Sequence, residues 1–325
     1  MSKKDDFAAA LQRRQPSTAV PLWELEFHPW DAASGRHVVL GREFEALSPA
    51  QQEKAVQTNA EIMAVVCEDL HFAGVTAPSH YWEIAPGEPA FYWLPGNWRF
   101  ALIEALRRVL PKDVMLIAGS GGVMCMPGAT EYVDFCYLLH DDPAQVDKRA
   151  QDTLKNGLDN ARRLRDLGVE AVFTASDLAD NHGPFFSPPQ MQRFVLPYMT
   201  QWAAAVAEMG LFSILHCDGN IMPCLEDFAA TGLNAIQAID PTAGMDMASA
   251  KAKVSGRVCL CGNVSVGNLV LGTPQSVYDE TAALLKTCKA GGGLALGASN
   301  AVQPEVKMEN YRAVIAAWKD HGQYE

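Results

Sequence analysis

The sequence lacks the features of a membrane-spanning or secreted protein. No apolar run approaches the roughly 20 residues that cross a bilayer, and the paired acids Asp5-Asp6 interrupt any signal peptide at the N-terminus. The eight cysteines form no CxxC pair and no disulfide-framework spacing, so reduced thiols in the core of a cytoplasmic protein are expected. Cys259 and Cys261 share a strand face and could hold a soft metal, although free buried thiols are the favoured interpretation.

Basic residues are also scarce. The chain has 26 basic against 38 acidic side chains, a formal net charge of −12, and its runs of Lys or Arg are no longer than two residues. Such a surface repels the phosphates of nucleic acids and of anionic membranes, so neither is expected as a partner. The apolar fraction of 49% with 20% charged residues is typical of a globular chain with a sizeable core.

Eight apolar runs of strand length alternate with amphipathic segments of helix length, the pattern of an α/β chain with a parallel sheet. The runs cover residues 20–27, 72–77, 114–118, 170–175, 211–216, 235–239, 258–262 and 294–298. Eight parallel strands close a barrel, and a chain of 325 residues fits one domain of that kind. We predict an N-terminal arm at residues 1–18 and a single (β/α)8 TIM barrel over residues 19–325.

In the first run, residues 23–28, polar side chains alternate with apolar ones. Alternate side chains of a strand point to opposite faces. Because the apolar set is expected to meet the helices, Glu24, Glu26 and His28 are predicted to point into the barrel. Buried carboxylates need a partner, a proton or a cation, so Glu26 and His28 are candidate metal ligands. Trp23 and Glu24 are candidate substrate-binding residues; alternatively, Glu24 closes a buried hydrogen-bond network.

The fifth run ends with His216 and Asp218, which alternation places together in the lumen. An imidazole and a carboxylate at this spacing can share a metal, or the carboxylate can orient a catalytic imidazole. Alternatively, Asp218 caps the next helix beside a core histidine. Other strand ends contribute Asp177, Asp240, Asn263 and Asn300. With no Lys or Arg at any strand end, the mouth suits a cation, a metal ion or a neutral ligand better than a polyanion.

The longest irregular stretch, residues 78–97, follows the second run and contains Trp82 and Trp93 among its aromatic residues. Long ordered loops on the catalytic side of a barrel are usually functional. We predict a lid or an aromatic wall of the substrate pocket. A satellite hydrophobic cluster that packs the loop down fits the same pattern equally well.

Several segments together resemble the uroporphyrinogen decarboxylase superfamily. They are residues 183–188 (GPFFSP), 216–220 (HCDGN), 240–246, 262–264 (GNV), 271–274 (LGTP), 303–306 (QPEV) and 309–310 (EN). The resemblance covers nearly the whole chain and implies a (β/α)8 barrel. The superfamily holds both porphyrinogen decarboxylases and methyltransferases that work with a corrinoid-carrying partner protein, so the fold does not decide the function.

The chain departs from both branches of the superfamily in its site residues. The decarboxylases begin with an arginine-bearing strand that grips the propionates of their substrate, whereas residues 23–28 here carry carboxylates. Porphyrinogen decarboxylation is therefore not expected. The thiol-directed methyltransferases hold zinc through a His-x-Cys pair and a distant second Cys. This chain keeps His216 but has Asp218 at the first Cys and Ser299 near the second. A thiolate-rich zinc site is therefore not expected, but His216, Asp218 and Glu26 or His28 could still hold Zn²⁺ as harder ligands.

The sequence favours a methyltransferase of the corrinoid-dependent type that demethylates a small O- or N-methyl substrate, with a corrinoid protein as partner. The candidate catalytic residues are His216, Asp218, Glu26 and Asp177, which would activate the leaving group through a metal or by proton transfer. Asp240, Asn263 and Asn300 are predicted to orient the substrate. Two alternatives stay open: a decarboxylase or lyase for a smaller acid, which needs a cationic anchor, and a non-catalytic ligand-binding barrel.

Overall fold

The computed structural model describes residues 2–78, 94–254 and 256–324. Its core is a seven-stranded sheet in the order β1-β2-β3-β6-β7-β8-β9, and all neighbouring strands are parallel. The strands are β1 (Gly74–Thr76), β2 (Met115–Gly119), β3 (Ala171–Ala175), β6 (Phe212–Cys217), β7 (Ala235–Ala238), β8 (Cys259–Cys261) and β9 (Leu294–Ala295). Each strand overlaps one of the predicted runs.

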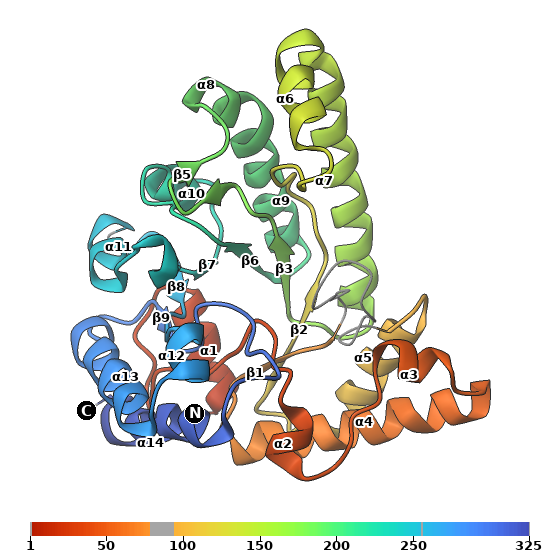
Figure 1. Ribbon diagram of the computed structural model, residues 1–325, viewed down its shortest axis with the longest axis vertical. Coiled ribbons are helices and arrows are strands. Elements are labelled where there is room, and N and C mark those ends of the chain that lie inside the picture. Colours follow the sequence, from red (N-terminus) through yellow and green to blue (C-terminus); the bar gives the residue numbers. More distant parts are fainter. Residues whose placement is uncertain (1, 79–93, 255, 325) are drawn as a thin grey trace.

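The remaining predicted run, residues 20–27, lies between the two edge strands of this sheet. Leu22 pairs in parallel with Leu296 next to β9, and the Trp23 N–H donates to the Leu296 carbonyl at 3.0 Å. On the other side, the Ala73 N–H donates to the Leu22 carbonyl at 2.8 Å, immediately before β1. The run therefore links β9 to β1, although its hydrogen bonding is too sparse for a regular strand. The predicted (β/α)8 barrel is confirmed (Figure 1).

Helices surround the sheet, as the alternation of the sequence predicts (Figure 1). They are α1 (Lys3–Leu11), α2 (Trp30–Ser34), α3 (Gly41–Glu45), α4 (Pro49–Asp69), α5 (Trp98–Val109), α6 (Tyr132–Asp141), α7 (Pro143–Asp166), α8 (Pro188–Gln190), α9 (Leu196–Glu208), α10 (Leu225–Ala230), α11 (Met247–Val254), α12 (Val266–Leu271), α13 (Pro274–Cys288) and α14 (Met308–His321). A π-helical turn (Met191–Val195), a 3₁₀ turn (Pro241–Ala243) and a hairpin of β4 (Ala179–Asp180) and β5 (Gly183–Pro184) complete the described elements. None of the described helices has the length and apolar character needed to cross a bilayer.

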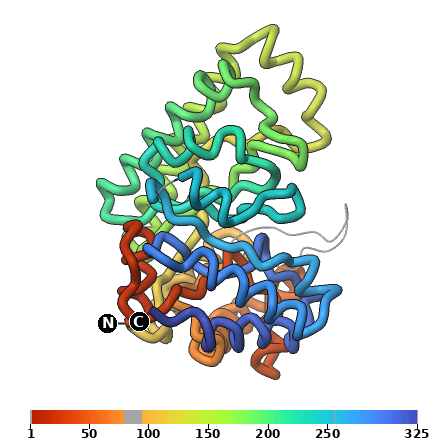
Figure 2. The backbone as a smooth tube through the Cα atoms, turned by 90° about the vertical axis from the view of Figure 1, so that its left-hand side faces the viewer, coloured from red at the N-terminus to blue at the C-terminus, as the bar shows by residue number. Residues whose placement is uncertain are grey.

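The N-terminal end of the barrel is filled by apolar side chains. Trp23, Leu25, Ile117 and Phe173 form one buried cluster there, together with Phe7 and Leu11 of α1. Helix α1 therefore packs against the interior of the barrel. The segment that follows α1 pairs with the end of the chain through an antiparallel bridge from Ala19 to Gln323. Figure 2 shows the segments before and after this bridge on the same side of the barrel.

This packing reverses the predicted faces of the first run. Trp23 and Leu25 point into the barrel, whereas the Glu24 carboxylate is directed toward α14. Glu24 accepts hydrogen bonds from the Tyr311 hydroxyl (2.7 Å) and the Ala298 N–H (2.8 Å). The prediction that Glu24 faces the lumen is wrong because the narrow end of the barrel is a packed apolar core. The alternative, a buried hydrogen-bond network closed by Glu24, is confirmed.

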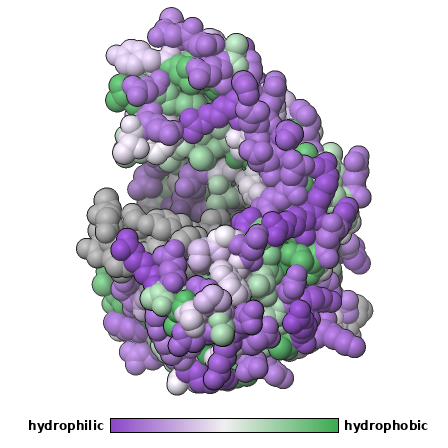
Figure 3. Space-filling model, turned by 90° about the vertical axis from the view of Figure 1, so that its right-hand side faces the viewer, coloured by the Kyte–Doolittle hydropathy of each residue, from purple (hydrophilic) through white to green (hydrophobic). Residues whose placement is uncertain are grey.

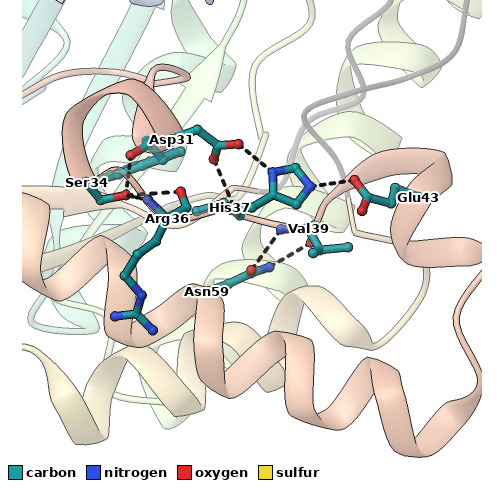
Figure 4. A network of polar contacts seen from close by, with 9 residues as sticks. Asp31, Ser34, Arg36, His37, Val39, Glu43 and Asn59 are labelled. Atoms are coloured by element: carbon teal, nitrogen blue, oxygen red, sulfur yellow. Dashed lines mark hydrogen bonds and ion pairs between the residues drawn. The ribbon is translucent and has the colours of Figure 1, made fainter.

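A polar cluster ties α2 to α3 at the surface (Figure 4). Both ring nitrogens of His37 face carboxylates: Nδ1 lies 2.5 Å from Asp31 Oδ2 and Nε2 lies 2.8 Å from Glu43 Oε2. Asn59 of α4 holds the segment that follows: its side-chain oxygen accepts the Val39 N–H and its side-chain nitrogen donates to the Val39 carbonyl. Two carboxylates favour the imidazolium form of His37, so they raise its pKa, and the hydrogen bond with Asp31 contributes most.

We expect His37 to titrate above its ordinary pKa of 6.5, and Asp31→Asn to lower that pKa more than Glu43→Gln does. A raised pKa means that the cluster's contribution to stability is fully present below pH 6.5 and is lost as the pH rises through the raised value. Titration of the His37 ring signals by NMR measures the pKa directly. A His37 pKa at or below 6.5 would contradict the imidazolium assignment.

Candidate active site

Three acidic or basic side chains converge where β3 and β6 end. Asp177 follows β3, His216 lies in β6, and Asp218 comes directly after it. One ligand atom of each lies within 4.8 Å of the other two. His216 Nε2 is 3.7 Å from Asp218 Oδ2, and the Asp218 N–H donates to Asp177 Oδ1 at 2.9 Å. The structure therefore brings together three of the predicted catalytic residues.

The register of the sheet explains this convergence. His216 pairs with Ala175 of β3 on one side and with Gln237 of β7 on the other. The His216 Nδ1 lies 2.5 Å from Gln237 Oε1, and the Gln237 amide nitrogen donates to the Ala298 carbonyl at 3.2 Å. Because this second bond fixes the amide with its oxygen toward the ring, Nδ1 donates to Gln237 and Nε2 is the ring nitrogen that faces Asp218.

Sequence reasoning missed Gln237. The signal was a single polar residue in an otherwise apolar strand, Ala235–Ala238, on the same face as Ala235 in the barrel interior. A buried amide there needs a specific partner, and the neighbouring strand supplies it in His216.

Asp218 is the carboxylate of the group whose hydrogen bonding is incomplete among the described residues. Its Oδ2 accepts a hydrogen bond from Asn300 at 2.6 Å, but its Oδ1 is buried without a hydrogen-bond partner among the residues that the structure describes. Burial raises the pKa of Asp218; His216 and the Asn300 bond act in the opposite direction, and the charges of Asp177 and Asp240 raise it further. A buried carboxylate oxygen without a donor favours a bound proton or cation. Helix α10 begins after Cys224, so Asp218 is not its cap.

Glu26 and His28 do not join this group. They pair with each other, with Glu26 Oε2 at 3.2 Å from His28 Nε2, and both side chains are almost fully buried. Asp177 takes the place that was predicted for them beside His216 and Asp218. Alternation could not locate the two residues because this part of the chain forms only isolated bridges, at Leu22 and Phe27.

The other predicted ligand-orienting residues lie near the same ends of the strands. Asp240 Oδ1 accepts the N–H of Thr242 in the 3₁₀ turn after β7, and Asn263 after β8 donates its amide to the Ile239 carbonyl at 2.7 Å. Asn300 contacts Asp218 directly. Trp82 and Trp93 lie outside the described residues. A space-filling view shows a deep hollow between the upper part of the molecule, which carries α6, and the lower part, which carries α4 (Figure 3).

The backbone is strained where β7 enters the site. Ala238 and Ile239 have φ values of 111° and 48°, which side-chain-bearing residues rarely adopt. Beside them, a Cβ on Gly262 would lie 2.7 Å from the Ala238 carbonyl oxygen, so only glycine fits there. Such strain concentrates at functional sites, and here it directs the chain toward Asp240 and Asn263.

The cysteines are free thiols, in agreement with the sequence prediction for their redox state, but two of the eight are not in the core. Cys125 and Cys136 are exposed, whereas Cys259 and Cys261 lie in the barrel interior. A hydrogen bond with Cys259 and burial raise the pKa of Cys261 well above its ordinary value. Their position among apolar side chains of the barrel interior supports the interpretation of these two as core residues.

Comparison with known proteins agrees with the fold and the resemblance. The model of the uroporphyrinogen decarboxylase (URO-D) family matches residues 97–321, more than half of the chain. The chain therefore belongs to the uroporphyrinogen decarboxylase family, and this membership supports an enzyme.

Individual relatives are distant. A uroporphyrinogen decarboxylase from Cellvibrio japonicus is 24% identical over 344 residues, which cover 98% of this chain and 86% of that protein. One from Idiomarina loihiensis is 27% identical over 233 residues, 66% of this chain and 61% of that protein. Among solved structures, a methyltransferase from Methanosarcina mazei superposes with a TM-score of 0.74 at 17% identity, over 98% of this chain and 99% of its own. At that identity the likeness shows the fold alone.

Proposed function

We propose that the protein is a methyltransferase of a corrinoid-dependent system that demethylates a small O- or N-methyl compound. The observation that carries this proposal is the group of Asp177, His216 and Asp218 at the mouth of the barrel. The charged groups that act most strongly on Asp218 are His216, Asp177 and Asp240, and none of them is a lysine or arginine. Such a site is suited to activating a leaving heteroatom and poorly suited to gripping a polycarboxylate.

The donor set fits a metal ion such as Zn²⁺. Imidazole nitrogen and carboxylate oxygen are ordinary zinc ligands, and the buried Asp218 Oδ1 has no donor among the described residues. The Nδ1 of His216 is held by Gln237, as the second nitrogen of a metal-bound histidine usually is. In this proposal Asp177, His216 and Asp218 hold the ion. When bound, it supplies Lewis acidity toward the oxygen or nitrogen that loses the methyl group.

The residues of the chain position the substrate and manage its proton. As the methyl group passes to the corrinoid of a partner protein, the bonding electrons stay on the substrate heteroatom, which then needs a cation or a proton. Without an ion, Asp218, whose pKa is raised by burial, can instead keep a proton for that heteroatom. His216 Nε2 lies 3.7 Å from Asp218 Oδ2. Asp240, Asn263 and Asn300 would orient the substrate from neighbouring strand ends. We expect this reaction in the cytoplasm, where the free thiols stay reduced.

A second candidate, decarboxylation of a smaller acid, is favoured by the relatives named uroporphyrinogen decarboxylase. It needs a cationic group that holds the carboxylate at the reacting centre. The charged groups that act most strongly on Asp218 include no such cation.

We expect no CO₂ release from uroporphyrinogen and no micromolar binding, because its many carboxylates would meet Asp177, Asp218 and Asp240 in a partly desolvated mouth. The measurement combines three assays: elemental analysis of the purified protein, CO₂ release from uroporphyrinogen, and demethylation of methoxylated aromatics and methylated amines with a reduced corrinoid protein. Demethylated product that requires the corrinoid protein supports the proposal. Micromolar binding of uroporphyrinogen together with CO₂ release would replace it with the decarboxylase.

A further inference from the structure

A second cleft, with a volume of about 600 Å³, lies at the end of β2 between α5 and α7. Its basic side chains are Arg99 of α5 and Arg163 of α7, and one part of its lining is the chain from Ser120 to Gly122. None of these residues belongs to the group of Asp177, His216 and Asp218. Both arginines reach the end of β2 from the helices that flank it, so they add positive charge there although they do not lie in strand-end segments.

The two guanidinium groups are held close together by one aromatic ring. Both lie over the Phe100 ring, with Arg99 Cζ 4.3 Å and Arg163 Cζ 3.4 Å from its centroid. Each donates one N–H to an amide oxygen at 3.1 Å, Arg99 to Asn160 and Arg163 to Asn97. No carboxylate in the described part of the chain forms an ion pair with either arginine. Burial, and next the charge of Arg163, lower the pKa of Arg99.

The remaining charge in the cleft does not neutralise this pair. The acidic residue in its lining, Asp159, is bound to Arg162 at 2.7 Å and lies 3.6 Å from Lys155. The cleft is therefore positively charged on a protein whose net charge is −12. Two like charges over one ring raise the energy of the cleft, and a bound anion lowers it.

The main chain adds further donors. Gly121 and Gly122 have φ values of 68° and 132°, and a Cβ on Gly157 of α7 would lie 2.3 Å from Gly122 Cα, so the loop and the helix touch through glycines. The side-chain nitrogen of Asn160 donates to the carbonyls of Gly119 (3.3 Å) and Ser120 (3.1 Å). The N–H groups of Gly121 and Gly122 donate to no atom of the described residues. Free N–H groups in such a glycine turn are typical of anion-binding loops.

From these contacts we propose that the cleft binds an oxyanion of the phosphate type, either free phosphate or a phosphate monoester. Two guanidinium groups offer paired N–H donors that match phosphate oxygens, and their two charges match a dianion, which a single carboxylate does not. The volume of about 600 Å³ leaves room for an organic group beyond the phosphate. The assignment holds whichever reaction the catalytic group performs.

The cleft is also connected to that catalytic group. After Gly122, the Val123 N–H donates to Thr174 Oγ1 at 3.4 Å, and the Val123 carbonyl accepts from Ser176 Oγ at 2.8 Å. Three residues later, the Met126 N–H donates to the Asp177 carbonyl at 2.7 Å. A ligand that orders the glycine turn therefore acts on the same segment that supports Asp177.

The test is isothermal titration calorimetry of the full chain with inorganic phosphate, phenyl phosphate and benzoate, with sodium chloride at matched ionic strength as a blank. We expect saturable binding of phosphate and a loss of about 10- to 100-fold in affinity in Arg99→Gln and in Arg163→Gln, the effect of removing charge-assisted hydrogen bonds. The matched control is Arg165→Gln on the same helix. Among the described residues Arg165 pairs with its neighbour Asp166, and it does not line the cleft, so its variant should bind as the wild type does.

The outcomes separate the two sources of phosphate. Tighter binding of phenyl phosphate than of phosphate indicates a monoester ligand, and equal binding indicates phosphate itself; both support the site. Benzoate bound as tightly as phosphate would overturn the assignment to a dianion. Absence of saturable binding by the wild type, or unchanged affinity in both arginine variants with native circular dichroism, would overturn the site altogether.

Discussion

Replacing His216 with alanine is expected to lower the rate of methyl transfer by about 10³-fold while the protein stays folded, a loss within the range for removing a positioned acid–base or ligand group. His216 is the basic member of the catalytic group, and its removal leaves the partly buried Asp218 facing the charges of Asp177 and Asp240 without compensation. Its imidazole lies at a strand end near the mouth rather than in the apolar cluster, so stability should change less than activity. Turnover, bound metal and circular dichroism measure the three effects.

The matched control is His182→Ala. His182 lies on the loop after β3. Its side chain is 93% exposed and lies outside the catalytic group. That variant should keep wild-type turnover and metal content. Wild-type activity in a folded His216→Ala protein would remove the catalytic assignment and favour a structural histidine bonded to Gln237.

The order of elements could be predicted from the sequence because each strand of a parallel barrel is buried on both faces and flanked by helices, which leaves short apolar runs separated by amphipathic segments. Which side chains of the first run face the lumen could not be predicted. Alternation states which side chains share a face, but not which face is the lumen. The orientation depends on Trp23, which fills the N-terminal end of the barrel, and on Tyr311, whose hydroxyl donates to Glu24 although the two residues are 287 positions apart in the sequence.

The candidate site could also be predicted only in part, for the residues that lie on one strand. His216 and Asp218 lie two residues apart, so strand geometry alone places them together. Asp177 and Gln237 join them through the register of neighbouring strands, which the sequence does not state. Arg99 and Arg163 are further from prediction, because they lie on two helices and meet only where the glycine turn after β2 lets α7 approach.

Ionisation of Glu24 is expected to destabilise the protein as the pH rises from about 4.5 to about 8. Burial raises the pKa of Glu24 from 4.5 to about 8, against the opposing effect of the hydrogen bonds from Tyr311 and Ala298. Within this window the native state holds a proton that the unfolded state has released. The stabilisation is therefore fully present below pH 4.5 and is lost as the pH rises through about 8, at roughly 1.4 kcal/mol per pH unit or about 5 kcal/mol in total.

The control is Glu24→Gln, which keeps the shape of the protonated side chain and cannot ionise. Its amide oxygen can accept the Ala298 N–H, and its amide nitrogen can donate to the Tyr311 oxygen in place of the bond that Tyr311 now donates. Urea denaturation of both proteins at several pH values between 5 and 8 measures the free energy of unfolding. We expect the wild type to lose stability relative to the variant at every step upward in pH. Parallel curves for the two proteins would show that Glu24 is ionised in the native state throughout, and that its two hydrogen bonds outweigh burial.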